Sequence, residues 1–227
     1  YFSERGDPRL GIVQVVNDPS KARASAEEMA TLKFLADTYP DSPWYYKADD
    51  DAYLHAPHLA DLALRYDPSK DWYIGTQLPY DRGDGSVQKY CAGGVGYLIS
   101  NSLMKRIASS LSAPIESCCS DVQVGTLVQR ALRAADGADV CTSPPPGSHV
   151  FHASGSVVRP AGFDTAFNTT VLHNLVLDSA GRDLLQSAVG FHYVTPIEQY
   201  IVRSLYWHVD EPGRPGHERG HHVVRRP

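Results

Sequence analysis

The chain has 227 residues, of which 42% are hydrophobic, enough for one large domain or two small ones with an apolar core. Its formal net charge of −5 at pH 7 and its pI of about 6.0 argue against a nucleic-acid-binding surface. No apolar run reaches the roughly 20 residues that cross a bilayer, and nothing reads as a signal peptide. The chain starts at Tyr1 without a methionine, so we expect it to be part of a longer protein.

The N-terminal part predicts a strand followed by a helix. Residues 10–16 (LGIVQVV) are short, apolar and rich in β-branched side chains, as in a buried strand. Ser25 and Glu28 have the spacing of a capping box, which opens a helix that runs to about Tyr39. Pro40 follows and ends this helix.

The stretch 44–55 (WYYKADDDAYLH) is the strongest functional signal. Its aromatic residues favour an extended strand, in which Asp49 and Asp51 face one way and Asp50 the other. Three adjacent carboxylates repel one another, and a divalent cation would offset that repulsion. Mg²⁺ and Mn²⁺ prefer oxygen ligands and combine a few carboxylates with substrate phosphates. We therefore expect a metal held against a diphosphate, and the alternative is a solvated acidic turn.

The elements that follow alternate between helix and strand: a helix over 59–64, a strand over 71–77, and a turn-rich loop over 81–86. Residues 90–100 (YCAGGVGYLIS) then place Gly93 and Gly94 inside an apolar strand pattern. Glycines in that setting mark a bulge or a close approach of the backbone to another group.

Two more helices are predicted over 101–111 and from Asp121 onwards, the second capped by Ser120, and a last helix over 195–208. This alternation predicts an α/β fold with a mixed, mostly parallel central sheet flanked by helices. We expect one domain over residues 1–210 and a flexible basic tail over 211–227. In such sheets ligands bind at the carboxyl ends of the strands, which is where Asp49 to Asp51 are predicted to lie.

The four cysteines lack the paired Cys-x-x-Cys spacing of a zinc site. Cys118 and Cys119 are adjacent and poorly placed to bond each other, so we expect them to bond Cys91 and Cys141, in an oxidising compartment. Four free buried thiols are the alternative. Asn168 begins a possible N-glycosylation sequon, Asn-Thr-Thr.

Several motifs stand in a specific order along the chain: 44–51 (WYYKADDD), 91–97 (CAGGVGY), 121–125 (DVQVG), the pair Phe151-His152, and 191–194 (FHYV). In this order they resemble glycosyltransferase family 31 of the GT-A fold, which includes Fringe-type and core 1 β1,3-galactosyltransferase-type enzymes. The first three look like the family's DxD strand, its GGAGY segment and its acidic DVxxG motif. The C-terminal motif and the helix after it are similar to core 1 galactosyltransferases.

The sequence departs from the family pattern in three places. The family's first nucleotide-binding strand would precede Tyr1 and is missing from this chain. Ser120 stands where the family has an acidic residue. Ala30 stands at a position that is often basic, although Lys33 is close by. These departures bear on nucleotide affinity and donor choice more than on the fold.

The resemblance implies an inverting, metal-dependent transfer of a sugar, with galactose expected, from a UDP-sugar to a glycan hydroxyl in β1,3 linkage. Asp51 is the expected direct ligand of Mn²⁺ (or Mg²⁺), together with His152 and Asp49. Asp49 and Asp50 would contact the ribose or metal-bound waters. The cofactor-binding glycines, Gly93 and Gly94, would let the backbone approach the sugars. Asp121 is the expected catalytic general base.

Each residue also fits a plainer role, since His152 suits a surface position and Asp121 a helix cap. Three other functions are open: a non-catalytic chaperone or glycan-binding module on the same fold, a Fringe-type β1,3-N-acetylglucosaminyltransferase, and a metal-dependent phosphohydrolase. The last would need more carboxylates or histidines near the sheet. The resemblance further implies the Golgi lumen, a membrane anchor N-terminal to this chain as in a type II membrane protein, a glycoprotein or glycan acceptor, and a possible homodimer.

Overall fold

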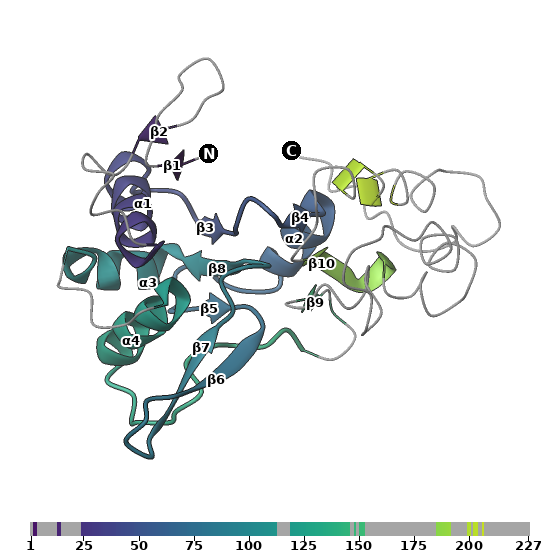
Figure 1. Ribbon diagram of the computed structural model, residues 1–227. Coiled ribbons are helices and arrows are strands. Elements are labelled where there is room, and N and C mark those ends of the chain that lie inside the picture. The colour runs from purple at the N-terminus through teal and green to yellow at the C-terminus, as the bar shows by residue number, and fades with distance from the viewer. Residues whose placement is uncertain are drawn as a thin grey trace.

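The computed structural model describes residues 2–3, 13–14, 24–112, 119–145, 148, 150–152, 185–191, 199–200, 202–203 and 206 (Figure 1). The sequon at Asn168, Cys118 and the predicted tail at 211–227 lie outside these ranges. Across the described ranges, no helix has both the length and the apolar character that crossing a bilayer requires.

The helices are α1 (Ala24–Thr38), α2 (Ala56–Ala63), α3 (Asn101–Ile107), the short 3-10 helix η3 (Ala108–Ser110) and α4 (Ser120–Leu132). The strands are β1 (Phe2–Ser3), β2 (Val13–Gln14), β3 (Trp44–Lys47), β4 (Tyr53–Leu54), β5 (Tyr73–Ile74), β6 (Gln77–Asp81), β7 (Val87–Cys91), β8 (Tyr97–Ser100), β9 (Val150–His152) and β10 (Ala188–Phe191). The described positions within the predicted helix at 195–208 are helical.

The central sheet has the order β3-β8-β5, and β8 runs antiparallel to both neighbours. A hairpin of β6 and β7 is also antiparallel, as is the pair β4 and β10. Parallel pairing joins β9 to β10 and β1 to β2. The predicted α/β class is confirmed, but a mostly parallel sheet is wrong for the described strands. The β6–β7 hairpin is antiparallel because residues 82–86 join its strands without a crossover helix, and β8 runs opposite to both of its partners, β3 and β5.

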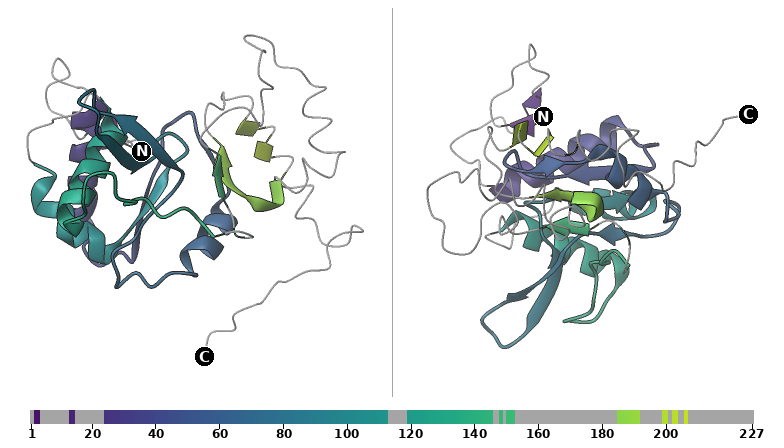
Figure 2. Two further views of the ribbon diagram at one scale, coloured as in Figure 1. Left: turned by 90° about the horizontal axis from the view of Figure 1, so that it is seen from below. Right: turned by 90° about the vertical axis from the view of Figure 1, so that its right-hand side faces the viewer.

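Both faces of the central sheet are covered, as Figure 1 and the turned views of Figure 2 show. Alternate residues of β8 point to opposite faces, and all four are buried. Tyr97 and Ile99 join the larger core cluster with residues of α1, α3 and α4. Leu98 joins a second cluster with Leu62 of α2 and Val189 of β10. The sheet therefore forms the middle layer of the molecule.

A disulfide joins Cys91 at the end of β7 to Cys141, which lies 50 residues further on. The expected bonds from Cys118 and Cys119 to these two cysteines are therefore wrong. The reason is tertiary, because the chain after α4 returns to the central sheet and Thr142 forms a parallel bridge with Ile74 of β5. That return places Cys141 beside Cys91 in the core, where both are buried.

Candidate functional site

Strand β3 is an edge strand of the central sheet, and the acidic segment follows directly after its C-terminal end. Lys47, its last residue, pairs with Tyr97 of β8, so both side chains lie on the same face. Beyond Lys47 the chain leaves the sheet, and the Ala52 amide donates to the Asp49 carbonyl oxygen across 3.2 Å. Asp50 and Asp51 thus lie in a turn, which we call the acidic turn (residues 49–52). The predicted strand alternation does not extend to them.

Lys47 is the centre of the contacts around this turn. Its ammonium Nζ lies 2.6 Å from Asp49 Oδ1 and 3.1 Å from Glu28 Oε2. It also donates to the carbonyl oxygen of Gly93 over 3.4 Å. Burial lowers the pKa of Lys47, but the Glu28 and Asp49 carboxylates outweigh that effect, so its pKa lies above the usual value. Lys47 is therefore charged across the physiological range.

Glu28 of α1 is buried beneath Lys47 and also accepts a hydrogen bond from the Tyr97 hydroxyl. Burial and the nearby Glu28 carboxylate raise the pKa of Tyr97 well above its usual value, so the hydroxyl stays protonated and donates. The predicted capping box is wrong, because Ser25 lies inside α1 and Glu28 points to the sheet. Its two oxygens bind Tyr97 and Lys47 instead of the helix N-terminus.

The glycine turn between β7 and β8 connects the acidic turn to α4. The Asp49 amide donates to the Gly94 carbonyl oxygen at 3.1 Å. The Gly93 amide donates to Asp121 Oδ2 at 3.0 Å. A Cβ on Gly93 would lie 3.0 Å from the Asp121 Cβ and 3.2 Å from Lys47 Nζ. The close approach predicted for these glycines is thus an approach to Asp121 and Lys47, while the approach to a sugar stays a prediction.

Asp121 lies in the first turn of α4 and is half-buried. Helix α4 begins at Ser120 and its N-cap is Cys119, which makes no side-chain capping bond, so the predicted cap at Ser120 is wrong by one residue. The second oxygen of Asp121, Oδ1, accepts from the Val122 amide at 2.9 Å. The carboxylate therefore binds its own helix with one oxygen and the glycine turn with the other.

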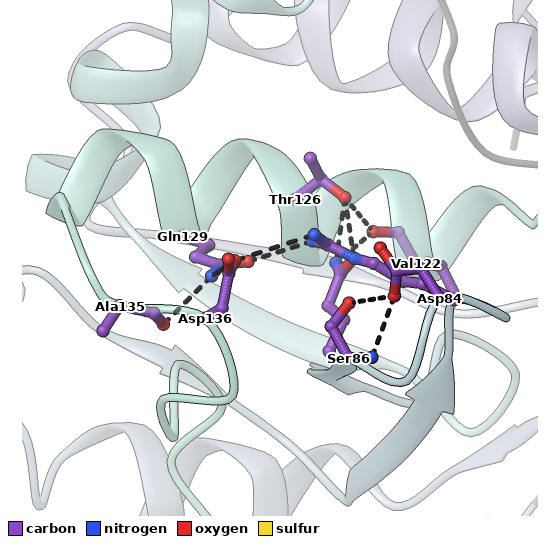
Figure 3. A network of polar contacts seen from close by, with 9 residues as sticks. Asp84, Ser86, Val122, Thr126, Gln129, Ala135 and Asp136 are labelled. Atoms are coloured by element: carbon purple, nitrogen blue, oxygen red, sulfur yellow. Dashed lines mark hydrogen bonds and ion pairs between the residues drawn. The ribbon is translucent and has the colours of Figure 1, made fainter.

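A network of amide side chains holds α4 against the β6–β7 hairpin (Figure 3). Gln88 is buried and donates through Nε2 to the Val122 carbonyl at 2.8 Å and to the Thr126 hydroxyl at 2.9 Å. Arg82 donates to the Gln88 oxygen at 2.8 Å and to Gln129 at 3.3 Å. We call Arg82, Gln88, Thr126 and Gln129 the amide network. It fixes the helix whose first turn carries Asp121.

Gly125 of the DVQVG motif explains how α4 comes so close to the hairpin. A Cβ at this position would lie 2.6 Å from the Cβ of Tyr90 on β7. A side chain there would push the helix away from the strand. The glycine of this motif therefore serves packing, while its aspartate faces the glycine turn.

The predicted metal ligands come from the acidic turn, which precedes β4, and from His152 on β9, and β10 lies between these two strands. In the register of β10, Phe191 pairs with Tyr53 of β4 on one side and with His152 of β9 on the other. Since adjacent strands lie about 4.8 Å apart, the His152 backbone is roughly 10 Å from that of Tyr53, just after the acidic turn. The side chain of His152 lies outside the described part of the structure.

The residues present fit a hydrated hard cation better than a closed cage of protein ligands. Among the described side chains, no group of three or more His, Cys, Asp or Glu is arranged to hold a metal. Asp49 and Asp50 are exposed and Asp51 is half-buried, so the acidic turn offers carboxylate oxygens to solvent. Cations such as Mg²⁺ and Mn²⁺ accept such sites because they keep waters or phosphate oxygens as further ligands. The C-terminal segment reaches the same turn, where Gln199 donates to the Asp50 carbonyl at 3.2 Å.

Sequence reasoning missed two residues of this site, Glu28 and Lys47. Lys47 and Asp49 are two residues apart at the end of a strand, and that spacing could have predicted a shared face. Nothing in the helix sequence distinguishes a buried Glu28 from a solvated one. Its role depends on Tyr97, which is distant in the chain.

Comparisons with known proteins identify related sequences over the part of the chain that carries these residues. The model of the Fringe-like family matches residues 1–141, which include the acidic turn, the glycine turn and Asp121. Human chondroitin sulfate glucuronyltransferase is 37% identical over 126 residues, covering 54% of this chain and 15% of that protein. Glycoprotein-N-acetylgalactosamine 3-beta-galactosyltransferase 1 of Xenopus laevis is 22% identical over 178 residues, covering 76% of this chain and 48% of that protein.

Mouse beta-1,3-glucosyltransferase is 29% identical over 79 residues, covering 34% of this chain and 16% of that protein. The chain thus spans less than half the length of these relatives. Their names share one reaction type, the transfer of a sugar, and differ in the sugar transferred. Because the family model covers more than half of the chain and includes the residues that meet at the glycine turn, the chain belongs to the Fringe-like family of glycosyltransferases.

Proposed function

We propose that this chain is the catalytic part of an inverting, metal-dependent β1,3-glycosyltransferase of the GT-A type. It would move a sugar from a UDP-sugar to a hydroxyl of a glycan or glycoprotein acceptor. One observation carries the proposal: both backbone groups of Gly93 are bound to the site. The Gly93 carbonyl accepts a hydrogen bond from Lys47, which pairs with Asp49, and the Gly93 amide donates to Asp121. Asp49, one of the carboxylates suited to a metal diphosphate, and Asp121, the carboxylate suited to accept a proton, are thus linked through one turn.

Asp121 is the proposed general base. A carboxylate offers about four lone-pair sites, so two backbone amides leave room for the proton of an acceptor hydroxyl. In the single displacement, that proton goes to Asp121 while the acceptor oxygen bonds to the anomeric carbon. The bond from that carbon to the diphosphate breaks, and UDP leaves with its electron pair. The Gly93 and Val122 amides hold the carboxylate in one orientation throughout.

Asp51, Asp49 and His152 are the proposed ligands of Mn²⁺ or Mg²⁺. Bound there, the cation would neutralise the diphosphate leaving group. Asp50 and the backbone at Gly93 and Gly94 remain the proposed contacts of the nucleotide sugar. The acidic turn supports this assignment because Asp49 and Asp50 are exposed, and because Asp49 pairs with Lys47, which binds the carbonyl of the same Gly93 whose amide binds Asp121.

Galactose is the donor sugar we propose to test first. The printed names of the relatives include glucuronyl, galactosyl and glucosyl transfer, so those donors belong in the same screen. The Cys91–Cys141 disulfide supports an oxidising compartment, in line with the proposed Golgi lumen.

A donor and acceptor screen tests the proposal. UDP release is measured from UDP-galactose, UDP-glucuronic acid, UDP-glucose and UDP-N-acetylglucosamine, with and without glycan acceptors and with Mn²⁺ or EDTA. We expect acceptor-dependent release from one donor that EDTA abolishes. Release from UDP-N-acetylglucosamine would favour a Fringe-type transferase. Acceptor binding with no release from any donor would favour a glycan-binding module and overturn the proposal.

The metal site has its own test. Asp51→Ala removes the proposed direct ligand, so Mn²⁺-dependent UDP binding should be lost while the fold persists, because Asp51 lies in a turn outside β3. The matched control is Asp41→Ala, an exposed aspartate before the other end of β3. Calorimetric titration of UDP with Mn²⁺ measures both variants. Equal UDP affinity in the Asp51 variant and the wild type would contradict the assignment.

A further inference from the structure

Four side chains form a continuous polar chain from the core to the acidic turn. Tyr97 is fully buried and donates to Glu28, which pairs with Lys47, which pairs with Asp49. Side-chain exposure rises outward, from 3% at Glu28 through 14% at Lys47 to 46% at Asp49. We call Tyr97, Glu28 and Lys47 the buried triad.

We propose that the buried triad is a positioning device, with Lys47 as the residue that orients Asp49 and the glycine turn. An ammonium has three N–H donors. The Lys47 ammonium meets three acceptors from three segments: Glu28 on α1, Asp49 on the acidic turn and the Gly93 carbonyl. Through the Gly93 amide, the same contact extends to Asp121. Lys47 thus sets the relative position of the two proposed functional carboxylates.

Stability alone does not account for the charges in the triad. Taking both ions of a pair out of water costs much of what their attraction returns, and apolar residues of similar size often serve equally well. The ion pair instead fixes the orientation of the Lys47 ammonium, since Glu28 holds Lys47 in place and Tyr97 holds Glu28. The register of β3 and β8 adds to this, because Lys47 lies directly opposite Tyr97.

The proposal rests on the proposed function only for the part that concerns nucleotide binding. Its structural part concerns the Gly93 and Asp49 amides, whose hydrogen bonds to Asp121 and to the Gly94 carbonyl depend on an ordered glycine turn. Amide hydrogen exchange reports local opening of such bonds without any ligand. The two parts can therefore fail separately.

The test is the double variant Glu28→Gln/Lys47→Met, which removes both buried charges together, so that no buried charge loses its partner and only the half-exposed Asp49 loses a contact. Exchange is measured by NMR at the Gly93 and Asp49 amides, with the Ile99 amide of β8 as the internal reference. We expect exchange to rise about tenfold at Gly93 and Asp49 relative to Ile99, as the loss of about one hydrogen bond would produce. Calorimetry of Mn²⁺ with UDP should show affinity about tenfold weaker, from the same misplacement of Asp49.

Unchanged exchange at both amides would overturn the proposal. Tighter Mn²⁺ binding would also overturn it, because Lys47 would then act only as a charge opposed to the cation. A wild-type protein that binds no UDP with Mn²⁺ would refute the proposed function, while the exchange result would still decide the positioning role. The matched control is Lys89→Met/Asp139→Asn, which removes a partly exposed ion pair on β7 outside the buried triad and should change neither readout.

A second variant keeps the proposal testable if the double variant does not fold. Tyr97→Phe keeps the ring that packs edge-to-face on Tyr73 and removes only the hydroxyl that holds Glu28. We expect exchange at Gly93 to rise by about threefold, since one indirect hydrogen bond is lost. Exchange at Gly93 equal to that of the wild type would count against positioning by the triad.

Discussion

Two polar clusters hold the site together, and they use different chemistry. The buried triad is ionic and ends at an exposed carboxylate, Asp49. The amide network around Gln88 consists mainly of neutral side chains and ends at Arg82 and Asp136 near the surface. Both secure the position of Asp121, the triad through the Gly93 turn and the network along α4.

This difference in chemistry corresponds to a difference in role: the amide network attaches a helix, and the buried triad orients the functional site. An amide pairs with backbone groups at little electrostatic cost, so it suits the attachment of a helix to a hairpin. A buried ion pair is expensive unless each charge is matched. Its placement beside the acidic turn, where a cation and a diphosphate are proposed to bind, indicates that direction and charge matter there more than net stability.

The largest expected effect is on catalysis. Asp121→Asn removes the proposed proton acceptor, and general-base catalysis is typically worth about 10²–10⁴-fold in rate. The amide retains one acceptor oxygen, so either Gly93 or Val122 loses its partner, at about 1–3 kcal/mol of stability. Transfer rate and melting temperature are measured on one sample. The control is Asp41→Asn, the same change at an exposed aspartate that precedes β3, which should leave the rate within about threefold.

A second prediction concerns the ionic cluster alone. Lys47→Met leaves the Glu28 carboxylate buried without its counter-ion, so the free energy of unfolding should fall by about 3–5 kcal/mol. Adding Glu28→Gln to this variant should restore most of that loss, because the unpaired charge is gone. Urea melts of the two variants and the wild type decide the matter. A double variant as unstable as the single one would show that packing, and not charge, dominates.

The amide network should respond more mildly. Gln88→Leu removes a neutral side chain and leaves the Val122 carbonyl and the Thr126 hydroxyl without one partner, at about 1–3 kcal/mol. Thr126 still donates to the Val122 carbonyl at 3.0 Å, which limits the loss. Urea melts measure it beside Lys47→Met. If Gln88→Leu lowered the free energy of unfolding as much as Lys47→Met does, the proposed energetic difference between the amide network and the buried triad would be wrong.

The smallest expected effect is a pH slope. Burial and Glu28 raise the pKa of Tyr97 in the folded state, so its contribution to stability is complete below pH 10 and is lost as pH rises above 10. Each such group gives a slope of about 1.4 kcal/mol per pH unit in that range. Tyr97→Phe should therefore reduce the alkaline slope by about that amount, measured by urea melts between pH 8 and about pH 11.5. Parallel slopes in both proteins would contradict the folded-state cause.

Much of the local structure follows from the sequence. Aromatic residues at 44–47, prolines after α1 and glycines before β8 mark the main elements, because strand propensity, proline geometry and glycine punctuation are local effects. The order of the acidic, glycine and DVQVG segments also indicated the family, and the family model confirmed it. The carboxylates Asp49 and Asp121 were identified as residue types that suit the chemistry.

What brings those residues together was decided only by the tertiary structure. The antiparallel register of β3 and β8 places Lys47 opposite Tyr97, and α1 adds Glu28, a partner 69 residues from Tyr97 in the sequence. Because the chain returns to the central sheet after α4, Cys141 lies beside Cys91 and bonds it, in place of the bonds that were expected from Cys118 and Cys119. Such contacts depend on packing between distant segments, so spacing along the chain carries no signal for them. The sequence alone determined which groups could act, and the fold determined which of them meet.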